Sequence, residues 1–206
     1  MKALSFDCWG SLVDWEAGAR TFVAALLARP TTSEVKRPSI EEWLARWQRI
    51  RRQMLRPYRP WRELLTRSYD ATMQVFGLEA FVDDGPLLVR HLASLEPRPD
   101  ARVALRKLGR KYRLAIASNA DRESLAEALG RLQAPFSSVV TAEDVKAYKP
   151  DPKLLGLVLE RLGLPASEVM HVAASAEEDG AAAEALGMRT ALIGEGATLT
   201  ELAETV

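Results

Sequence analysis

The sequence predicts an α/β protein in which a parallel β-sheet forms the core and a helical segment is inserted after the first strand. Short apolar runs recur near both ends of the chain, and helical patterns of about ten residues separate them. Strands that alternate with helices in this way are typical of βαβ units, in which helices cover both faces of a parallel sheet. The stretch from about Glu16 to His91 contains helical patterns and no comparable strand.

The predicted strands are too short to be helices and are rich in Val, Ile, Leu or Ala. They cover Leu4–Trp9, Arg113–Ser118, Ser137–Thr141, Val169–Ala174 and Arg189–Ile193. The helical patterns between them cover Asp100–Lys111, Asp121–Leu132, Pro152–Leu162 and Ala176–Leu186.

The inserted segment is divided by prolines, which interrupt helices. Its predicted helices are Ala17–Arg29, Ile40–Arg56 and Trp61–Phe76. We therefore expect two domains, with residues 1–15 and 92–206 forming the α/β core and residues 16–91 forming a helical domain.

The composition favours a folded protein with no strong affinity for polyanions. The chain has 206 residues, 48% of them hydrophobic, and 28 Lys and Arg balance 28 Asp and Glu. With a net charge of zero no whole-molecule field attracts nucleic acid or an anionic membrane, so we expect neither as a partner. The balance conceals one basic segment, Lys36–Arg67, within the helical domain.

The chain has a single cysteine, Cys8, which has no partner for an internal disulfide. Residues 1–7 lack the charged and then apolar pattern of a secretory signal. No apolar run approaches the roughly 20 residues that cross a bilayer. We therefore expect a cytoplasmic protein.

Side chains suited to chemistry follow several predicted strands. In parallel α/β sheets, ligands bind at the carboxyl ends of the strands. An acid, hydroxyl and amide groups, a lysine and a second acid suit nucleophilic chemistry by a carboxylate. These candidate residues are Asp7, Ser118, Asn119, Lys149, Ser175 and Asp179.

Four short motifs in order resemble the signatures of the haloacid dehalogenase superfamily. The resemblance implies a Rossmann-like core with an inserted helical cap, and Asp7 as the nucleophile that forms a covalent intermediate, which water then hydrolyses. The motifs are Phe6–Leu12, Ser118–Asn119, Tyr148–Pro152 and His171–Ser175 with Asp179.

The other candidate residues have physical roles that fit such a reaction. Lys149 would supply a cation beside the nucleophile, worth roughly 4 kcal/mol at about 4 Å and an effective dielectric near 20 before desolvation is counted. Asp179 would orient Lys149 or act as the base for the attacking water. Ser118 and Asn119 would hold an anionic substrate group. Trp9, Ser11 and Ser175 are further candidates for substrate contact.

Simpler explanations exist for these residues taken singly. An aspartate after a strand, such as Asp7 or Asp179, also serves in a turn or in the first turn of a helix. Lys149 before a proline also suits an exposed loop, and a strand-end turn accounts for Ser118 and Asn119. Asp151 fits best as the N-cap of the next helix.

Two departures separate this chain from the magnesium-dependent phosphatases of the superfamily. Those enzymes resemble one another in having a second aspartate two residues after the nucleophile, where this chain has Trp9. They also carry an acid at the position of Ala174. The phosphatase alternative, in which Asp7 and Asp179 hold Mg²⁺, therefore lacks one acid and one oxygen ligand.

The 2-haloacid dehalogenase branch needs neither group, and the chain is similar to it at Val13–Trp15 and Ser118–Arg122. The resemblance implies attack of Asp7 on C2 of a small 2-haloalkanoate, with no cofactor and no metal. It also implies a cap arginine near the halide, for which Arg46 is the best candidate and Arg49 the next. Ala176 and Leu155 replace an asparagine and a tyrosine that this branch often carries.

Two further hypotheses concern the level of catalytic activity and the oligomeric state. A catalytically weakened protein of the same fold is the third functional hypothesis, since the fourth motif has lost its acid. The Trp-rich helical segment favours an apolar patch through which two copies of the chain would pair as a homodimer.

Overall fold

The computed structural model describes residues 1–30, 34–194 and 197–206. The chain divides into two compact units, one made of Met1–Asp14 with Glu96–Val206 and the other of Trp15–Leu95. The first unit contains a parallel sheet and flanking helices, so the predicted α/β fold class is confirmed. The assignment of residues 16–91 as a cap, with 1–15 and 92–206 as the hydrolase core, stays a prediction.

A five-stranded sheet in the order β3-β2-β1-β4-β5 forms the centre of the first unit. All neighbouring strands are parallel, and every residue of β1 is buried. Because β1 lies between β2 and β4, the residues that follow these three strands meet at one edge of the sheet. The strands are β1 Ala3–Phe6, β2 Arg113–Ser118, β3 Phe136–Thr141, β4 Val169–Ala173 and β5 Arg189–Leu192.

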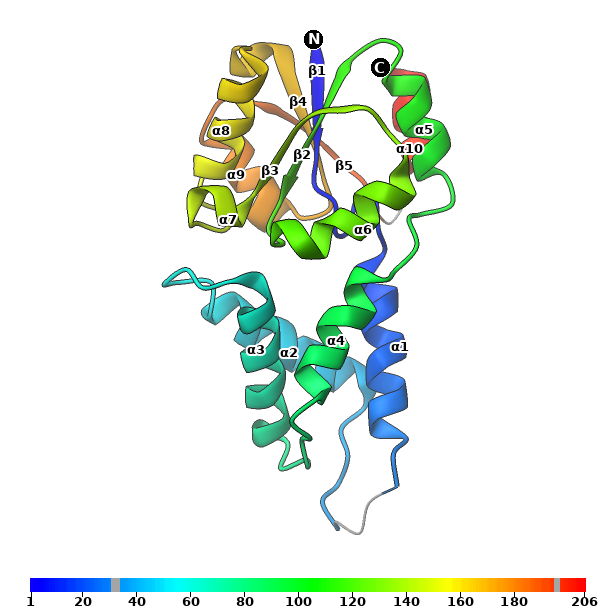
Figure 1. Cartoon of the computed structure of the whole chain (residues 1–206), viewed down its shortest axis with the longest axis vertical. Helices are drawn as coiled ribbons and strands as arrows, with labels where there is room; N and C mark the ends of the chain where they lie inside the picture. The colour runs from blue at the N-terminus through cyan, green and yellow to red at the C-terminus, as the bar shows by residue number, and fades with distance from the viewer. Residues whose placement is uncertain (31–33, 195–196) are drawn as a thin grey trace. The chain divides into compact units, whose positions relative to one another are not determined.

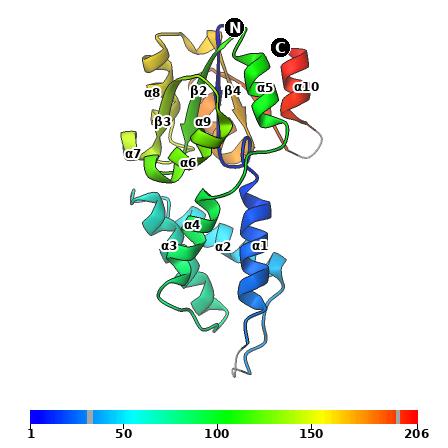
Figure 2. The same ribbon diagram turned by 45° about the vertical axis from the view of Figure 1, so that its right-hand side comes forward.

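Helices cover both faces of this sheet, with α5 and α10 on one side and α8 and α9 on the other (Figure 1). Helices α5 and α10 lie side by side in Figure 2. No helix in the described part of the chain has the length and apolarity of a membrane span. The helices are α5 Ala101–Leu108, α6 Arg122–Leu132, α7 Ala142–Val145, α8 Lys153–Leu162, α9 Ala181–Glu184 and α10 Leu199–Thr205, with a 3₁₀ turn at Ala166–Glu168.

The first strand ends three residues earlier than predicted, because a tight turn follows it. The N–H groups of Leu12 and Val13 both donate to the carbonyl of Cys8 at 2.9 Å. Gly10 has a φ of 118°, a conformation that only glycine adopts without strain. The Arg98 guanidinium donates to the Gly10 carbonyl at 2.9 Å, which fixes the turn.

The predicted helix Ala176–Leu186 begins as a π-helical turn, Ala176–Gly180, before α9. The N–H groups of Asp179 and Gly180 donate to the same carbonyl, that of Ser175, at 3.0 and 3.1 Å. A π turn has one more residue than an α-helical turn, and such turns are frequent at functional sites.

Within its described residues, 15–30 and 34–95, the second unit contains four helices, one more than predicted. Its core contains the rings of Trp43, Trp47 and Tyr69, with Trp43 5.7 Å from Trp47 and 5.8 Å from Tyr69 between ring centroids. The indole N–H of Trp47 donates to the hydroxyl of Ser68 at 2.8 Å. The helices are α1 Trp15–Leu27, α2 Ile40–Gln53, α3 Trp61–Val75 and α4 Asp84–Ala93.

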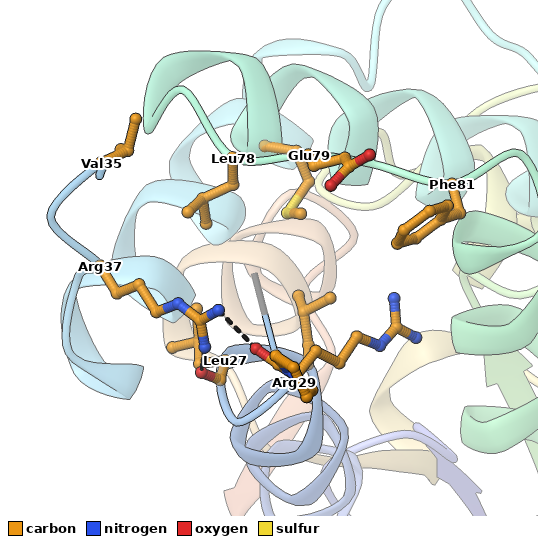
Figure 3. A pocket seen from close by; sticks show the side chains of 10 residues that line it. Leu27, Arg29, Val35, Arg37, Leu78, Glu79 and Phe81 are labelled. Atoms are coloured by element: carbon orange, nitrogen blue, oxygen red, sulfur yellow. Dashed lines mark hydrogen bonds between the residues drawn. The ribbon is translucent and has the colours of Figure 1, made fainter. Parts of the chain in front are cut away.

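A buried carboxylate and two arginines hold one end of this unit together. Asp84 accepts hydrogen bonds from Arg29 at 2.6 Å and from the hydroxyl of Tyr69 at 3.0 Å. Arg37 donates to the carbonyl of Arg29, across the small pocket that Figure 3 shows with Phe81 at its side. Both guanidinium groups are thus bound to neighbouring chain segments.

Candidate active site

The ammonium group of Lys149 lies at the centre of the site in the first unit. It donates to Asp7 Oδ1 at 2.8 Å, to the carbonyl of Ala117 at 2.9 Å and to Asp179 Oδ1. Asp7 follows β1, Ala117 lies in β2 and Asp179 lies in the π turn after β4. The structure therefore brings together the three residues that the sequence singled out for catalysis.

Lys149 stays charged in this position although its side chain is only 1% exposed. Burial by itself would lower the pKa of Lys149, but Asp179 and Asp7 outweigh burial and raise it. The three N–H bonds of the ammonium match its three acceptors, so none of its hydrogens is left unsatisfied.

The two carboxylates that share Lys149 differ in their ionisation. Burial is the largest effect on Asp7 and raises its pKa to about 7, with the charge of Asp179 adding to the rise and that of Lys149 opposing it. Burial also acts to raise the pKa of Asp179, but Lys149 and His171 outweigh it and lower that pKa to about 2. Asp179 is therefore the permanently ionised partner, and Asp7 the carboxylate whose ionisation is costly.

His171, which was not among the predicted site residues, contributes to the low pKa of Asp179. Its Nε2 lies 3.1 Å from Asp179 Oδ1 and its Nδ1 2.9 Å from the Ser5 hydroxyl. An ionised carboxylate only accepts hydrogen bonds, so Nε2 carries the hydrogen, and in the neutral ring Nδ1 accepts from Ser5. Burial lowers the pKa of His171, in keeping with a neutral ring.

A signal for His171 was present in the sequence. Ser5 and His171 are polar residues inside strands that are otherwise apolar, and they are paired in register across β1 and β4. Both are fully buried, and buried polar side chains need partners. The sequence thus showed two polar residues that needed partners, and the structure shows that they are partners of each other.

Asn119 links the lysine loop to the turn that follows β4. Its Oδ1 accepts the backbone N–H of Lys149 at 2.8 Å, and its Nδ2 donates to Glu178 Oε2 at 3.3 Å. The hydroxyl of Ser118 accepts the N–H of Ala120 at 3.2 Å, which holds the turn after β2. Both residues are buried at the predicted edge of the sheet.

The remaining predicted contact residues differ in what the structure shows of them. Trp9 and Ser11 lie in the turn after β1, and in the described residues the Trp9 Nε1 and Ser11 Oγ atoms are buried without a hydrogen-bond partner. Ser175 accepts the N–H of Glu178 at 3.1 Å, so its hydroxyl caps the π turn. Arg46 and Arg49 belong to the second unit, where both are exposed on α2. Contact of these residues with substrate stays a prediction.

The arrangement of donors does not suit a divalent cation. Asp7 Oδ1 and Asp179 Oδ1 both accept from Lys149, so the ammonium takes up one oxygen of each carboxylate. Among the residues described, no group of three or more His, Cys, Asp or Glu side chains is disposed to hold a metal. Ala174 provides no carboxylate in their place. We therefore derive no step through Mg²⁺.

Comparison with known proteins agrees with this geometry. A family profile described as haloacid dehalogenase-like hydrolase matches residues 1–187. The chain belongs to this family. The predicted resemblance and the predicted enzyme class, a hydrolase, are confirmed.

Two curated relatives of this hydrolase are dehalogenases. It is 28% identical over 194 residues to (S)-2-haloacid dehalogenase 4A of Burkholderia cepacia, covering 88% of this chain and 78% of that protein. It is also 28% identical over 199 residues to (S)-2-haloacid dehalogenase 1 of Pseudomonas sp. (strain CBS-3), covering 94% of this chain and 84% of that protein.

Solved structures of dehalogenases have the same fold as this hydrolase. One, a dehalogenase with an intermediate complex, gives a TM-score of 0.84 at 25% identity and covers 100% of this chain and 97% of its own. Another, an L-2-haloacid dehalogenase, gives a TM-score of 0.77 at 27% identity and covers 99% of this chain and 97% of its own.

The pKa values of the two carboxylates are shifted in opposite directions, which predicts opposite effects on stability when each is neutralised. Each pKa unit corresponds to about 1.4 kcal/mol. At pH 8 we expect Asp7→Asn to stabilise the folded protein by about 1 to 3 kcal/mol, because it removes a carboxylate that the fold prefers protonated. We expect Asp179→Asn to destabilise it by about 2 kcal/mol, because it removes one that the fold prefers ionised.

Urea unfolding of the parent and both variants at pH 8 and pH 4 measures these effects. Asp7 lowers the free energy of unfolding as pH rises from about 4 towards 7, because the unfolded chain ionises first. The stabilisation by Asp7→Asn therefore disappears at pH 4. The contribution of Asp179 is present above about pH 4 and is lost as pH falls towards 2. A change of the same sign in both variants at pH 8 would contradict the assignment.

Proposed function

We propose that this hydrolase removes halide from small 2-haloalkanoates through a covalent ester on Asp7. The observation that carries the proposal is the contact of Asp7 with Lys149 and, through it, with Asp179, at the edge of the sheet where α/β proteins bind ligands. The two curated relatives, whose names describe (S)-2-haloacid dehalogenases, support the choice of substrate.

In the first step an oxygen of Asp7 attacks C2, a carbon–oxygen bond forms and the halide leaves with the electrons of the carbon–halogen bond. Halide needs no proton to leave, so the lack of an acid at Trp9 is no obstacle. Lys149 stabilises the ionised form of Asp7 before attack, since it is the nearby charge that lowers the pKa of this carboxyl.

In the second step water attacks the carbonyl carbon of the ester. One proton of the water ends on the product hydroxyl and the other on Asp7, which then releases it. A pKa of about 7 allows Asp7 to release that proton near neutral pH. Asp179, with a pKa of about 2, is a weak base, so we assign it to holding Lys149 in place.

Several groups around Asp7 are suited to holding the substrate. Trp9 Nε1 and Ser11 Oγ are buried polar atoms whose hydrogen bonds no other described residue satisfies. A substrate oxygen or the departing halide would satisfy them. The N–H groups of Ser118, the last residue of β2, and of Asn119 are the other proposed contacts. Arg46 is the proposed cation near the halide.

Halide release tests the proposal. We expect release of chloride from L-2-chloropropionate without added metal and in the presence of a chelator, and a loss of about a thousandfold in kcat/KM for Asp7→Asn, because the nucleophile is removed. Asp151→Asn is the matched control. Asp151 accepts the N–H of Lys153 at the start of α8, so its removal leaves turnover within about threefold.

Chloride release that persists in Asp7→Asn would show that Asp7 is not the nucleophile. Chloride release that the chelator abolishes would show a metal-dependent reaction instead. Hydrolysis of p-nitrophenyl phosphate that depends on both Mg²⁺ and Asp7, without any halide release, would establish the phosphatase alternative. No turnover on either class of substrate would favour the third hypothesis, a weakened enzyme.

His171 provides a second prediction, because it positions Asp179. We expect His171→Phe to lower kcat about tenfold or more with little change in KM, since Asp179 loses a hydrogen bond and holds Lys149 less well. His171→Gln keeps an N–H donor and restores part of kcat. If His171→Gln and His171→Phe have the same kcat, the ring contributes packing alone.

A further inference from the structure

Arg98 precedes helix α5 and binds the turn that follows the proposed nucleophile. Its guanidinium donates twice to the Gly10 carbonyl, from Nε at 3.2 Å and from Nη2 at 2.9 Å. Its backbone N–H donates to the Leu12 carbonyl at 2.8 Å, and its own carbonyl accepts from Ala101 at 3.0 Å. The backbone of Arg98 is thus fixed on both sides, which directs its side chain at Gly10.

The Gly10 carbonyl is the main acceptor for this guanidinium. The carboxylate of Asp14 lies farther from Nη2, at 3.9 Å, and its side chain is 47% exposed. An ion pair of this length and exposure contributes little, because water screens it. A hydrogen bond from a charged donor to a carbonyl oxygen at 2.9 Å is stronger. Arg98 therefore acts mainly on the turn.

Gly10 is the residue of the turn at which such a contact has most effect. Its φ of 118° is a conformation that glycine reaches without strain, but glycine also has the widest choice of other conformations. The carbonyl of Val13 holds the Gly10 N–H at 2.7 Å, which leaves the carbonyl side of Gly10 to Arg98. Because the next peptide bond is planar, a fixed Gly10 carbonyl also fixes the orientation of Ser11.

The residues on either side of Gly10 are proposed substrate contacts. Trp9 Nε1 and Ser11 Oγ are buried, and in the described part of the chain neither atom has a hydrogen-bond partner. Donors bind a substrate more tightly when their direction is set in advance, because ordering them on binding costs free energy. The direction of both side chains depends on the backbone of Gly10, which lies between them.

The nucleophile itself is held by different contacts. The N–H of Asp7 donates to the carbonyl of Val172 at 2.8 Å, and its carboxylate accepts from Lys149. Neither contact involves Arg98. A change at Arg98 should therefore alter substrate binding more than the attack by Asp7.

We propose that Arg98 is a positioning residue for substrate binding, which holds the Gly10 carbonyl so that Trp9 and Ser11 keep the orientation in which they bind the substrate. In this role Arg98 acts through the turn and not on the reacting atoms. The inference rests on the proposed function and adds to it a residue outside the four motifs.

Steady-state kinetics on L-2-chloropropionate tests the inference, because a positioning role and a merely structural role differ in KM. We expect Arg98→Met, which keeps a long side chain and removes its donors, to raise KM about tenfold and to leave kcat within about threefold. Arg98→Lys keeps a cationic donor and gives a KM between those of the parent and Arg98→Met. A merely structural role lowers the fraction of folded enzyme, which reduces apparent kcat and leaves KM unchanged; that result would overturn the inference.

Arg102→Met is the matched control. The guanidinium of Arg102 also binds a backbone carbonyl, that of Arg131 at the end of helix α6, at 2.6 Å. Its removal takes away an arginine–carbonyl contact of the same kind at another place in the same unit. We expect it to leave KM unchanged.

A double-mutant cycle shows whether Arg98 acts through its proposed targets. In a protein that already carries Trp9→Phe and Ser11→Ala, we expect Arg98→Met to change KM by less than about threefold, since the donors that it positions are gone. A tenfold rise in both backgrounds would show that Arg98 acts by another route and would contradict the inference.

Binding of L-2-chloropropionate to Asp7→Asn, measured by calorimetry with and without Arg98→Met, separates this inference from the proposed function. We expect a Kd about tenfold higher with Arg98→Met. An equal Kd, or no binding to either protein, would overturn the role of Arg98. Halide release by Asp7→Asn would contradict the proposed nucleophile instead, and the KM of Arg98→Met would still decide the positioning role.

Discussion

A buried ammonium group holds three strand ends of the first unit together. Lys149 has almost no exposure, and its three hydrogens bind Asp7, the carbonyl of Ala117 and Asp179. A buried charge costs several kcal/mol unless it is paired and hydrogen-bonded, so all three acceptors must stay in place. The strand order brings these acceptors together, because β1 lies between β2 and β4 and each of the three strands supplies or precedes one acceptor.

The same contact gives two chemically identical side chains different properties. Both carboxylates are buried, which raises their pKa values. At Asp179 the two donors Lys149 and His171 outweigh burial and lower the pKa. At Asp7 burial outweighs Lys149, and the pKa rises. Environments that push the pKa values of two carboxylates apart are typical of sites where the two perform different tasks. Here the strongly ionised acid holds the lysine, and the other carboxylate, Asp7, is the one that we propose as the nucleophile.

The sequence predicted the sheet and the group of Asp7, Lys149 and Asp179, because both depend on local patterns. Short apolar runs mark buried strands, and the motifs place Asp7, Lys149 and Asp179 at strand ends. The sequence showed Ser5 and His171 as polar residues in apolar strands but did not pair them, because they lie 166 residues apart and meet only in the folded sheet. Contacts across the sheet are set by strand order, which local patterns leave open.

Three helices, α4, α7 and α10, were not predicted, and α7 is only four residues long. Helix α4 begins with Asp84, Gly85 and Pro86, residues typical of turns, although proline is well suited to the first turn of a helix. Helix α10 is short, but Thr198 and Glu201 form a capping box that marked its start in the sequence. The π turn at Ala176–Gly180 has no such local mark, because its sequence, Ala-Glu-Glu-Asp-Gly, is compatible with either kind of helical turn.

The covalent ester on Asp7 is the central claim, and isotope labelling tests it most directly. A single turnover of L-2-chloropropionate in ¹⁸O water, with enzyme in excess, is followed by mass spectrometry of the peptide that contains Asp7. The ester mechanism predicts ¹⁸O in the Asp7 carboxylate and unlabelled oxygen in the product hydroxyl. Label in the product hydroxyl with none in Asp7 would show direct attack by water and contradict the account.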